Sequence, residues 1–194
     1  MLNLPEACRL PDFSGLDAAP DGSPNESAAE PLDLRVAWNP QGLAVSLEVT
    51  GRKKRLENIA ANPAFAEGLH LWLDTRNTQN VHRATRFCHH FCLLPRGTSG
   101  QPQVVQFAIP RAKEDAPMAK PQEILVQASV RSDGYWLECW LPASALSGFD
   151  PEANPRLGFF YRVRDTDLGD RLFAAGAEFP FATDPSLWGT LELR

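Results

Sequence analysis

Two segments of the chain alternate strictly between apolar and other side chains. In residues 68–74 a leucine occupies every second position, and in residues 135–141 tyrosine, leucine, cysteine and leucine do the same. Because a β-strand points successive side chains to opposite faces, this period of two predicts half-buried strands whose apolar set faces a core. The opposite faces carry different side chains: His70, Trp72 and Asp74 in the first strand, and Trp136, Glu138 and Trp140 in the second.

The same alternation recurs along the rest of the chain. Residues 34–38 and 43–49 alternate on either side of a turn-like Asn-Pro-Gln-Gly sequence, which predicts a hairpin. Other alternating runs lie at 124–130, 157–163 and 191–193. We therefore expect roughly eight to ten short strands and an all-β fold, a single antiparallel β-sandwich of the immunoglobulin or jelly-roll kind with long loops. The expected core includes Leu69, Leu71, Tyr135, Leu137, Phe159 and Val163.

The length of 194 residues predicts one domain with a substantial core. Residues 1–30 are rich in Pro, Ala, Asp, Ser and Gly, so we expect a loop-like lead-in that either packs on the domain or trails from it. Residues 31–194 are expected to form the sandwich. The basic run at 52–55 is expected to lie in a solvated loop or a short helix.

The outward-facing tryptophans are the first candidates for function. Exposed clustered aromatic rings beside polar groups are typical of a binding surface, because so much apolar area in water is unfavourable. Such a surface requires that their strands share a sheet. The alternative is that residues 1–30 or a long loop cover the rings and make a second small core. The candidate ligand-binding residues are Trp72, Asp74, Trp136, Glu138, Trp140, Arg162 and Arg164.

The order of motifs in the second half of the chain resembles a known family. The motifs are Asp-Gly-Tyr-Trp-Leu-Glu at 133–138, Leu-Pro-Ala-Ser-Ala-Leu at 141–146, Leu-Gly-Phe-Phe-Tyr-Arg-Val-Arg-Asp-Thr-Asp at 157–167 and Pro-Ser-Leu-Trp-Gly-Thr-Leu-Glu-Leu at 185–193. They resemble the family 9 carbohydrate-binding modules and the broader DOMON-like sandwiches. The resemblance implies a β-sandwich that binds the ends of sugar chains between tryptophan faces and often carries structural calcium.

The leading functional prediction is therefore a non-catalytic binding module for carbohydrate. The alternative is a structural or protein-interaction domain that uses the same aromatic face to meet an unidentified protein partner or a second copy. A third possibility is a hydrolase that uses Asp74 and Glu138 as paired carboxylates, which needs the two acids about 5–10 Å apart across an open cleft. Sequence signatures of nucleophilic catalysis and of phosphate-binding loops do not occur in the chain.

Charge and hydropathy narrow the set of partners. The net charge of −5 argues against nucleic acid, which favours basic surfaces through counterion release. Apolar runs are too short for a membrane span, so no membrane partner is expected. The first residues lack the charged and apolar regions of a secretory signal, and we expect a cytoplasmic protein with reduced cysteines.

The segment 82–92 is dense in histidine and cysteine, with His82, Cys88, His90 and Cys92 as conceivable zinc ligands. On a strand Cys88 and Cys92 lie about 13 Å apart, too far for one ion. We therefore expect no metal. Residues 86–94 are predicted to be a central strand, with Phe87 and Phe91 on one face and the two cysteines on the other.

The turn at 165–170 carries three carboxylates around a glycine. Calcium prefers such oxygen ligands, and the resemblance adds weight to a structural calcium site. No glutamate closes a full calcium loop, so a turn capped by its own side chains is the preferred interpretation and no cofactor is expected. Haem is not expected, because Met1 and Met118 are the only methionines. The calcium candidates are Asp165, Asp167 and Asp170.

Overall fold

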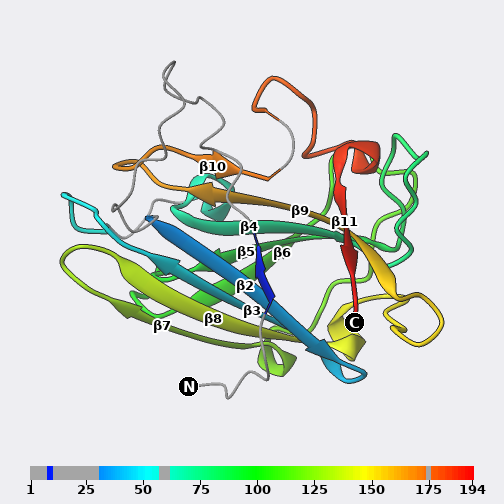
Figure 1. Cartoon of the computed structure of the whole chain (residues 1–194), viewed down its shortest axis with the longest axis horizontal. Helices are drawn as coiled ribbons and strands as arrows, with labels where there is room; N and C mark the ends of the chain where they lie inside the picture. The colour runs from blue at the N-terminus through cyan, green and yellow to red at the C-terminus, as the bar shows by residue number, and fades with distance from the viewer. Residues whose placement is uncertain (1–7, 11–30, 57–61, 174–175) are drawn as a thin grey trace, which may run out of the picture.

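The computed structural model describes residues 8–10, 31–56, 62–173 and 176–194. Two antiparallel sheets pack face to face (Figure 1). Sheet A has the strand order β1-β2-β3-β8-β7, with β1 (Cys8–Leu10), β2 (Leu32–Asn39), β3 (Gly42–Val49), β8 (Tyr135–Pro142) and β7 (Leu125–Val130). Sheet B has the order β10-β9-β4-β5-β6, with β10 (Arg171–Leu172), β9 (Arg156–Arg164), β4 (Gly68–Asp74), β5 (Cys88–Leu94) and β6 (Gln103–Phe107).

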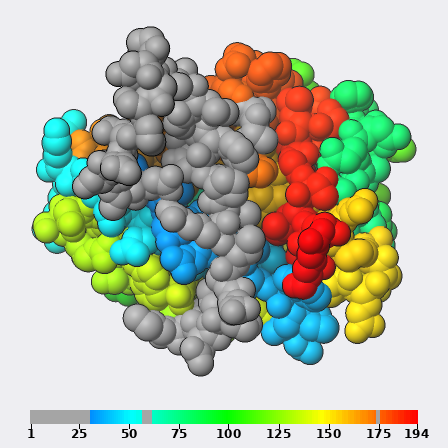
Figure 2. All heavy atoms as spheres, viewed as in Figure 1, coloured from blue at the N-terminus to red at the C-terminus, as the bar shows by residue number. Residues whose placement is uncertain are grey.

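The last strand, β11 (Gly189–Glu192), pairs with β9 outside this path. It lies at the surface, where it appears in red in Figure 2. Helical structure among the described residues consists of short 3-10 turns: η1 (Pro63–Phe65), η2 (Pro121–Glu123), η3 (Ala143–Ala145) and η4 (Pro185–Leu187). None of the helices in the described part of the chain is long and apolar enough to cross a membrane. The predicted all-β sandwich is confirmed.

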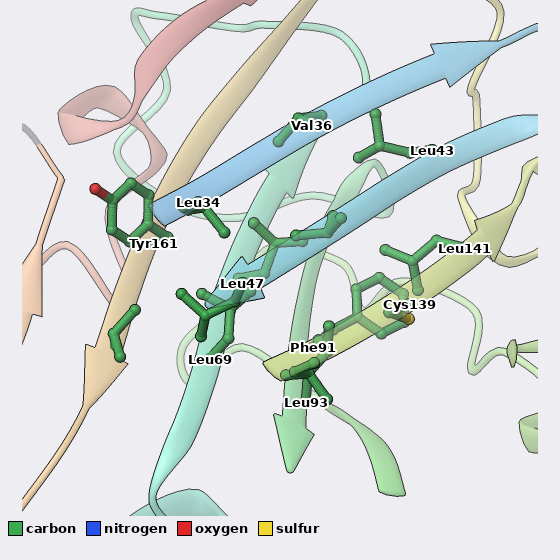
Figure 3. Packing of buried hydrophobic residues seen from close by; sticks show 14 of the residues in the cluster. Leu34, Val36, Leu43, Leu47, Leu69, Phe91, Leu93, Cys139, Leu141 and Tyr161 are labelled. Atoms are coloured by element: carbon green, nitrogen blue, oxygen red, sulfur yellow. The ribbon is translucent and has the colours of Figure 1, made fainter. Parts of the chain in front are cut away.

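The core lies between the sheets and consists of the alternating apolar positions of both. Leucine and valine side chains of β2 and β3 meet leucines of β4 and aromatic rings of β5 and β9 (Figure 3). The six residues predicted for the core are all buried, none of them more than 1% exposed. The predicted hairpin is also confirmed, since β2 and β3 pair from Leu32↔Val49 to Asn39↔Gly42 around a two-residue connection.

One surface prediction is wrong. Arg52, the first residue of the basic run, is only 5% exposed, whereas the next three basic residues are exposed. Its guanidinium forms ion pairs with Glu67 and Asp165, both of which are also buried. A buried charge is tolerated when it is paired in this way. A run of basic residues predicts solvent exposure. The prediction is wrong for Arg52 because the local sequence carries no information about acids that lie far along the chain.

The predicted lead-in is described only at Cys8–Leu10, where the backbone adds β1 to the edge of sheet A through pairing with β2. The rest of residues 1–30 lies outside the described residues. The remaining cysteines, Cys88, Cys92 and Cys139, are buried free thiols.

Candidate functional site

The predicted binding residues lie on two different outer faces of the sandwich. Trp72 pairs with His90 of β5 and Phe160 of β9, which places it on the outer face of sheet B together with Asp74, Arg162 and Arg164. Trp136, Glu138 and Trp140 belong to β8 and lie on the outer face of sheet A. The expectation that these side chains form a single surface is therefore wrong. Alternation predicts the face of a strand but not the sheet that the strand joins.

Trp72 forms part of a second small core. It is 3% exposed, its ring stacks on His90 with centroids 4.2 Å apart, and it meets Phe160 and Phe181 edge-on. Phe181 and Trp188 cover this part of sheet B from the C-terminal segment. The alternative in which a long loop covers an outward tryptophan is thus observed for Trp72. Trp72 is unavailable as an open platform for a ligand.

The two carboxylates proposed for hydrolysis do not form a pair. Asp74 is 2% exposed and caps the turn after β4 by accepting hydrogen bonds from the backbone N–H of Arg76 (2.9 Å) and Thr78 (2.6 Å). Glu138 is 7% exposed and accepts a hydrogen bond from Gln127 Nε2 at 3.0 Å. Since the acids face away from each other across the whole sandwich, the paired-carboxylate mechanism is contradicted.

Trp136 and Trp140 remain partly exposed on sheet A. Each ring is two positions from Glu138 along β8, so the Gln127–Glu138 pair lies between the two rings. Leu125, opposite Trp140 on β7, is 54% exposed. This face offers two half-buried rings, an exposed leucine and a carboxylate that is already hydrogen-bonded and covered.

Sheet B carries a more open aromatic surface at the start of β4. Phe65 is 63% exposed at the end of η1, and the Arg164 guanidinium lies over its ring, 5.5 Å from the centroid. Arg162, two residues earlier on the same outer face of β9, donates to Asp170 from Nε at 2.9 Å. We call the surface formed by Phe65, Arg162, Arg164 and Asp170 the Phe65–Arg164 corner. The sequence prediction includes the two arginines but misses Phe65, which lies in no alternating run.

Local sequence explains why Phe65 is held out in solvent. Asn62 caps η1 by accepting a hydrogen bond from Ala64 N at 3.0 Å, and Pro63 occupies the first helical position. Gly68 then opens β4 opposite Arg164 of β9. A Cβ at Gly68, whose φ is +145°, would lie 2.3 Å from the Leu93 carbonyl oxygen. The close approach of β5 at this point therefore requires glycine.

A buried ionic network joins the two sides of the corner. Glu67 Oε1 accepts hydrogen bonds from Arg52 (3.1 Å) and from Thr166 N and Oγ1 (2.8 and 2.7 Å). Arg52 also pairs with Asp165. Glu67 follows Phe65 by two residues and Asp165 follows Arg164 directly, so the network holds the ring and the arginine in register. A rigid support of this kind favours a preformed site.

Histidine and cysteine side chains lie beneath the corner. His70 Nδ1 is 3.4 Å from His90 Nε2, and His70 Nε2 is 3.6 Å from Cys92 Sγ. Burial lowers the pKa of His70 to about 4 and that of His90 to about 3, and it raises the pKa of the Cys92 thiol to about 12. The groups are therefore neutral near pH 7. Because His70 presents different nitrogens to its two neighbours, one metal ion cannot bridge all three.

No group of three or more His, Cys, Asp or Glu in the described ranges is arranged to hold a metal ion. The central strand predicted at 86–94 is β5, which lies between β4 and β6. Phe91 faces the core, and Cys88 and Cys92 lie on the opposite face, as predicted. Phe87 precedes the strand rather than lying in it.

The three aspartates of the 165–170 turn do not fit a calcium site. Asp165 accepts hydrogen bonds from Asp167 N (2.9 Å) and Leu168 N (2.8 Å) and pairs with Arg52. Asp167 accepts from the backbone N–H of Lys53 and Lys54, and Asp170 pairs with Arg162. Their oxygens thus meet protein cations and N–H groups rather than converging on a common point. These contacts support the interpretation of a self-capped aspartate turn.

A serine, a histidine and an aspartate meet near η4, but they do not form a catalytic triad. His82 Nδ1 lies 3.1 Å from both Asp184 Oδ2 and Ser186 Oγ, and Ser186 Oγ donates to Asp184 Oδ1 at 2.6 Å. A triad needs the acid and the nucleophile on opposite nitrogens of the imidazole. Here Asp184 caps η4 through Ser186 N, so the cluster is structural.

A groove of about 410 Å³ lies between β6 and the segment before β7. Its lining is mainly apolar and includes Val104, Met118 and Ile124. The Gln106 amide is already engaged, since it donates to Pro117 O (3.1 Å) and accepts from Ala119 N (2.7 Å). The groove therefore offers few groups for a polar ligand.

The fold is similar to solved structures of a family 9 carbohydrate-binding module from Caldicellulosiruptor kristjanssonii. The complex of that module with cellotriose has a TM-score of 0.64 and 17% sequence identity, over 87% of this chain and 78% of that chain. The complex with glucose has a TM-score of 0.61 and 16% identity, over 87% and 80%. The sequence matches no family model and no curated protein. The chain thus has the β-sandwich fold of a family 9 carbohydrate-binding module.

Proposed function

We propose that this chain is a non-catalytic carbohydrate-binding module whose ligand docks at the Phe65–Arg164 corner. One observation carries the proposal: the Phe65 ring is 63% exposed and its centroid lies 5.5 Å from the Arg164 guanidinium. The fold neighbours, which are family 9 modules in complex with cellotriose and with glucose, support a sugar as the ligand class. Phe65 supplies the stacking surface in this proposal, and Arg164 and Arg162 supply hydrogen-bond donors at its edge.

The chemistry of a sugar ring matches this surface. A pyranose presents C–H groups on its flat faces and hydroxyl groups at its rim. An exposed aromatic ring offers apolar area to the C–H face, and a charged donor makes stronger hydrogen bonds to the rim than a neutral donor does. The buried network of Arg52, Glu67 and Asp165 holds both elements, so little ordering is required when a ligand binds.

The tryptophan face of sheet A is the competing surface. Its rings are half-buried, and the polar group between them, Glu138, is 7% exposed and hydrogen-bonded to Gln127. Its exposed leucine, Leu125, is better suited to contact a protein partner than to contact the hydroxyl groups of a sugar. We therefore place the sugar on sheet B and keep Trp136 and Trp140 as the surface for comparison.

The proposal is tested by calorimetric titration of the protein with glucose and with cellotriose. Phe65→Ala is expected to weaken binding at least about tenfold, because it removes the apolar contact area of the exposed ring. The substitution should leave stability within about 0.5 kcal/mol, since Phe65 projects into solvent. Trp140→Ala is the matched aromatic control on the other sheet and is expected to bind like the wild type.

The other outcomes are equally informative. If Trp140→Ala abolishes binding and Phe65→Ala does not, the ligand site is the tryptophan face and the location proposed here is wrong. If neither sugar binds at millimolar concentration and the protein dimerises in a manner that Leu125→Asp disrupts, the protein-interaction alternative replaces the carbohydrate module.

A further inference from the structure

The carboxylates that the structure describes around the Phe65–Arg164 corner are engaged by other groups. Glu67 and Asp165 pair with Arg52, Asp170 pairs with Arg162, and Asp167 accepts two backbone N–H groups. Arg164 differs from its neighbours, because no carboxylate of the described residues lies within ion-pair distance of it. Its guanidinium lies over the Phe65 ring. The corner therefore combines an exposed aromatic surface with a cation that lacks an acidic partner in the described part of the chain.

We infer that the ligand of this corner is an acidic sugar, a pyranose whose carboxylate pairs with Arg164 while its ring stacks on Phe65. This inference rests on the proposed carbohydrate-binding function and specifies its ligand class. A hexuronate carries its carboxylate at the ring carbon where a neutral hexose carries a hydroxymethyl group. One molecule thus presents both a flat C–H face and an anion at its edge.

The geometry of arginine favours this choice. A guanidinium is a planar fork of N–H donors that matches the two oxygens of a carboxylate, and such charge-assisted pairs are stronger than hydrogen bonds to neutral hydroxyls. An arginine can keep contact with an aromatic ring while its N–H groups point outward in its own plane. Arg164 is partly exposed, so its donors can be reached from solvent.

The electrostatic environment points the same way. The net charge of the chain is −5, yet the outer face of β9 presents Arg162 and Arg164 side by side in alternation. Their field reaches the adjacent strand: burial chiefly lowers the pKa of His70 and the two arginines lower it further, while the Ala66 carbonyl and Asp170 raise it. Asp170 already pairs with Arg162, so Arg164 is the cation of the corner that an anionic ligand can pair with.

A matched ligand pair tests the inference. Glucose and glucuronate differ only in the oxidation of C6, so the ratio of their dissociation constants isolates the carboxylate. At low ionic strength we expect glucuronate to bind about tenfold more tightly than glucose, with the preference falling as salt is added. Arg164→Gln should bring the two ligands to equal affinity. Arg156→Gln removes the same charge from an exposed position at the far end of β9 and should keep the preference.

The outcomes separate this inference from the function on which it rests. If glucose and glucuronate bind equally and Phe65→Ala weakens both, the carbohydrate module stands and the acidic ligand class is wrong. If Arg156→Gln abolishes the preference as fully as Arg164→Gln does, the effect is one of net charge and the Arg164 pairing is wrong. If neither sugar binds, the proposed function itself fails.

Discussion

Trp72 is 3% exposed and Phe65 is 63% exposed, although tryptophan is the larger platform for a flat ligand. The difference arises from what covers each ring. Phe181 and Trp188 pack over Trp72, whereas Phe65 ends a 3-10 turn that projects from the sheet. The alternation of residues 68–74 predicts correctly that Trp72 points away from the main core. It carries no information about the segment more than 100 residues later that covers it.

Trp72 also stacks on His90, one of three histidines whose pKa is lowered by burial. Burial lowers the pKa of His70 and His89 to about 4 and that of His90 to about 3. An unfolded histidine has a pKa of about 6.5, so between pH 6.5 and 4 the unfolded state binds more protons than the folded state. The free energy of unfolding therefore falls as the pH is lowered through this window.

We predict that His90→Phe makes this decrease shallower. The variant keeps a ring against Trp72 but removes one titrating group, which contributes at most about 1.4 kcal/mol per pH unit. Urea unfolding of the wild type and the variant at several values between pH 6.5 and 5 measures the two slopes. Equal slopes would show that His90 is protonated in the folded state as readily as in the unfolded state, which would contradict the lowered pKa of His90.

Strands are the elements for which sequence prediction works best here. The period of two predicts β2, β3, β4, β7, β8 and β9 and assigns their inward side chains, because one buried face imposes that period. β1 and β10 are too short to show any period and are missed. Strand partners are missed for another reason: β4 and β8 have the same pattern, yet β4 pairs with β5 and β9 in one sheet and β8 with β3 and β7 in the other.

Substitution of Gly68 tests how closely β4 packs against β5. Gly68→Ala places a Cβ 2.3 Å from the Leu93 carbonyl oxygen at a φ of +145°, so the strand pair must shift. Gly51→Ala is the matched control, since its φ is +80° but nothing lies within 4 Å of the added carbon. The control should lose about 1 kcal/mol through backbone strain alone.

Gly68→Ala should lose clearly more than the control, because the clash adds to the strain. Thermal and urea unfolding of both variants measure the difference. A smaller loss at Gly68 than at Gly51 would mean that β4 and β5 do not approach each other closely at this point, and that the start of β4 beside Arg164 is free to move.

At the scale of the whole molecule, the candidate residues of β4 and β9 lie on one outer face of the sandwich and those of β8 on the other, although the sequence predicts a single surface for them. The motifs of residues 133–193 lead to the correct fold, because an order of strands and turns describes the scaffold. The order of motifs does not predict the candidate site, because the residues of the site come from η1, β9 and the turn after β9. Phe65 and Arg164 are 99 positions apart in the chain and are brought together by the pairing of β4 with β9 and by the ion pairs of Arg52 with Glu67 and Asp165.

The central claim, a sugar at the Phe65–Arg164 corner, is tested most directly by mapping the ligand on the protein. Isotope-labelled protein is titrated with cellotriose and with glucuronate while backbone amide, arginine Nε–H and indole N–H signals are followed by NMR. We predict that the largest shifts occur at residues 64–67, at residues 162–167 and at the Arg164 Nε–H, with the indole signals of Trp136 and Trp140 unmoved. Shifts centred on those two indoles and on β7, or no shifts at saturating ligand, would contradict the account.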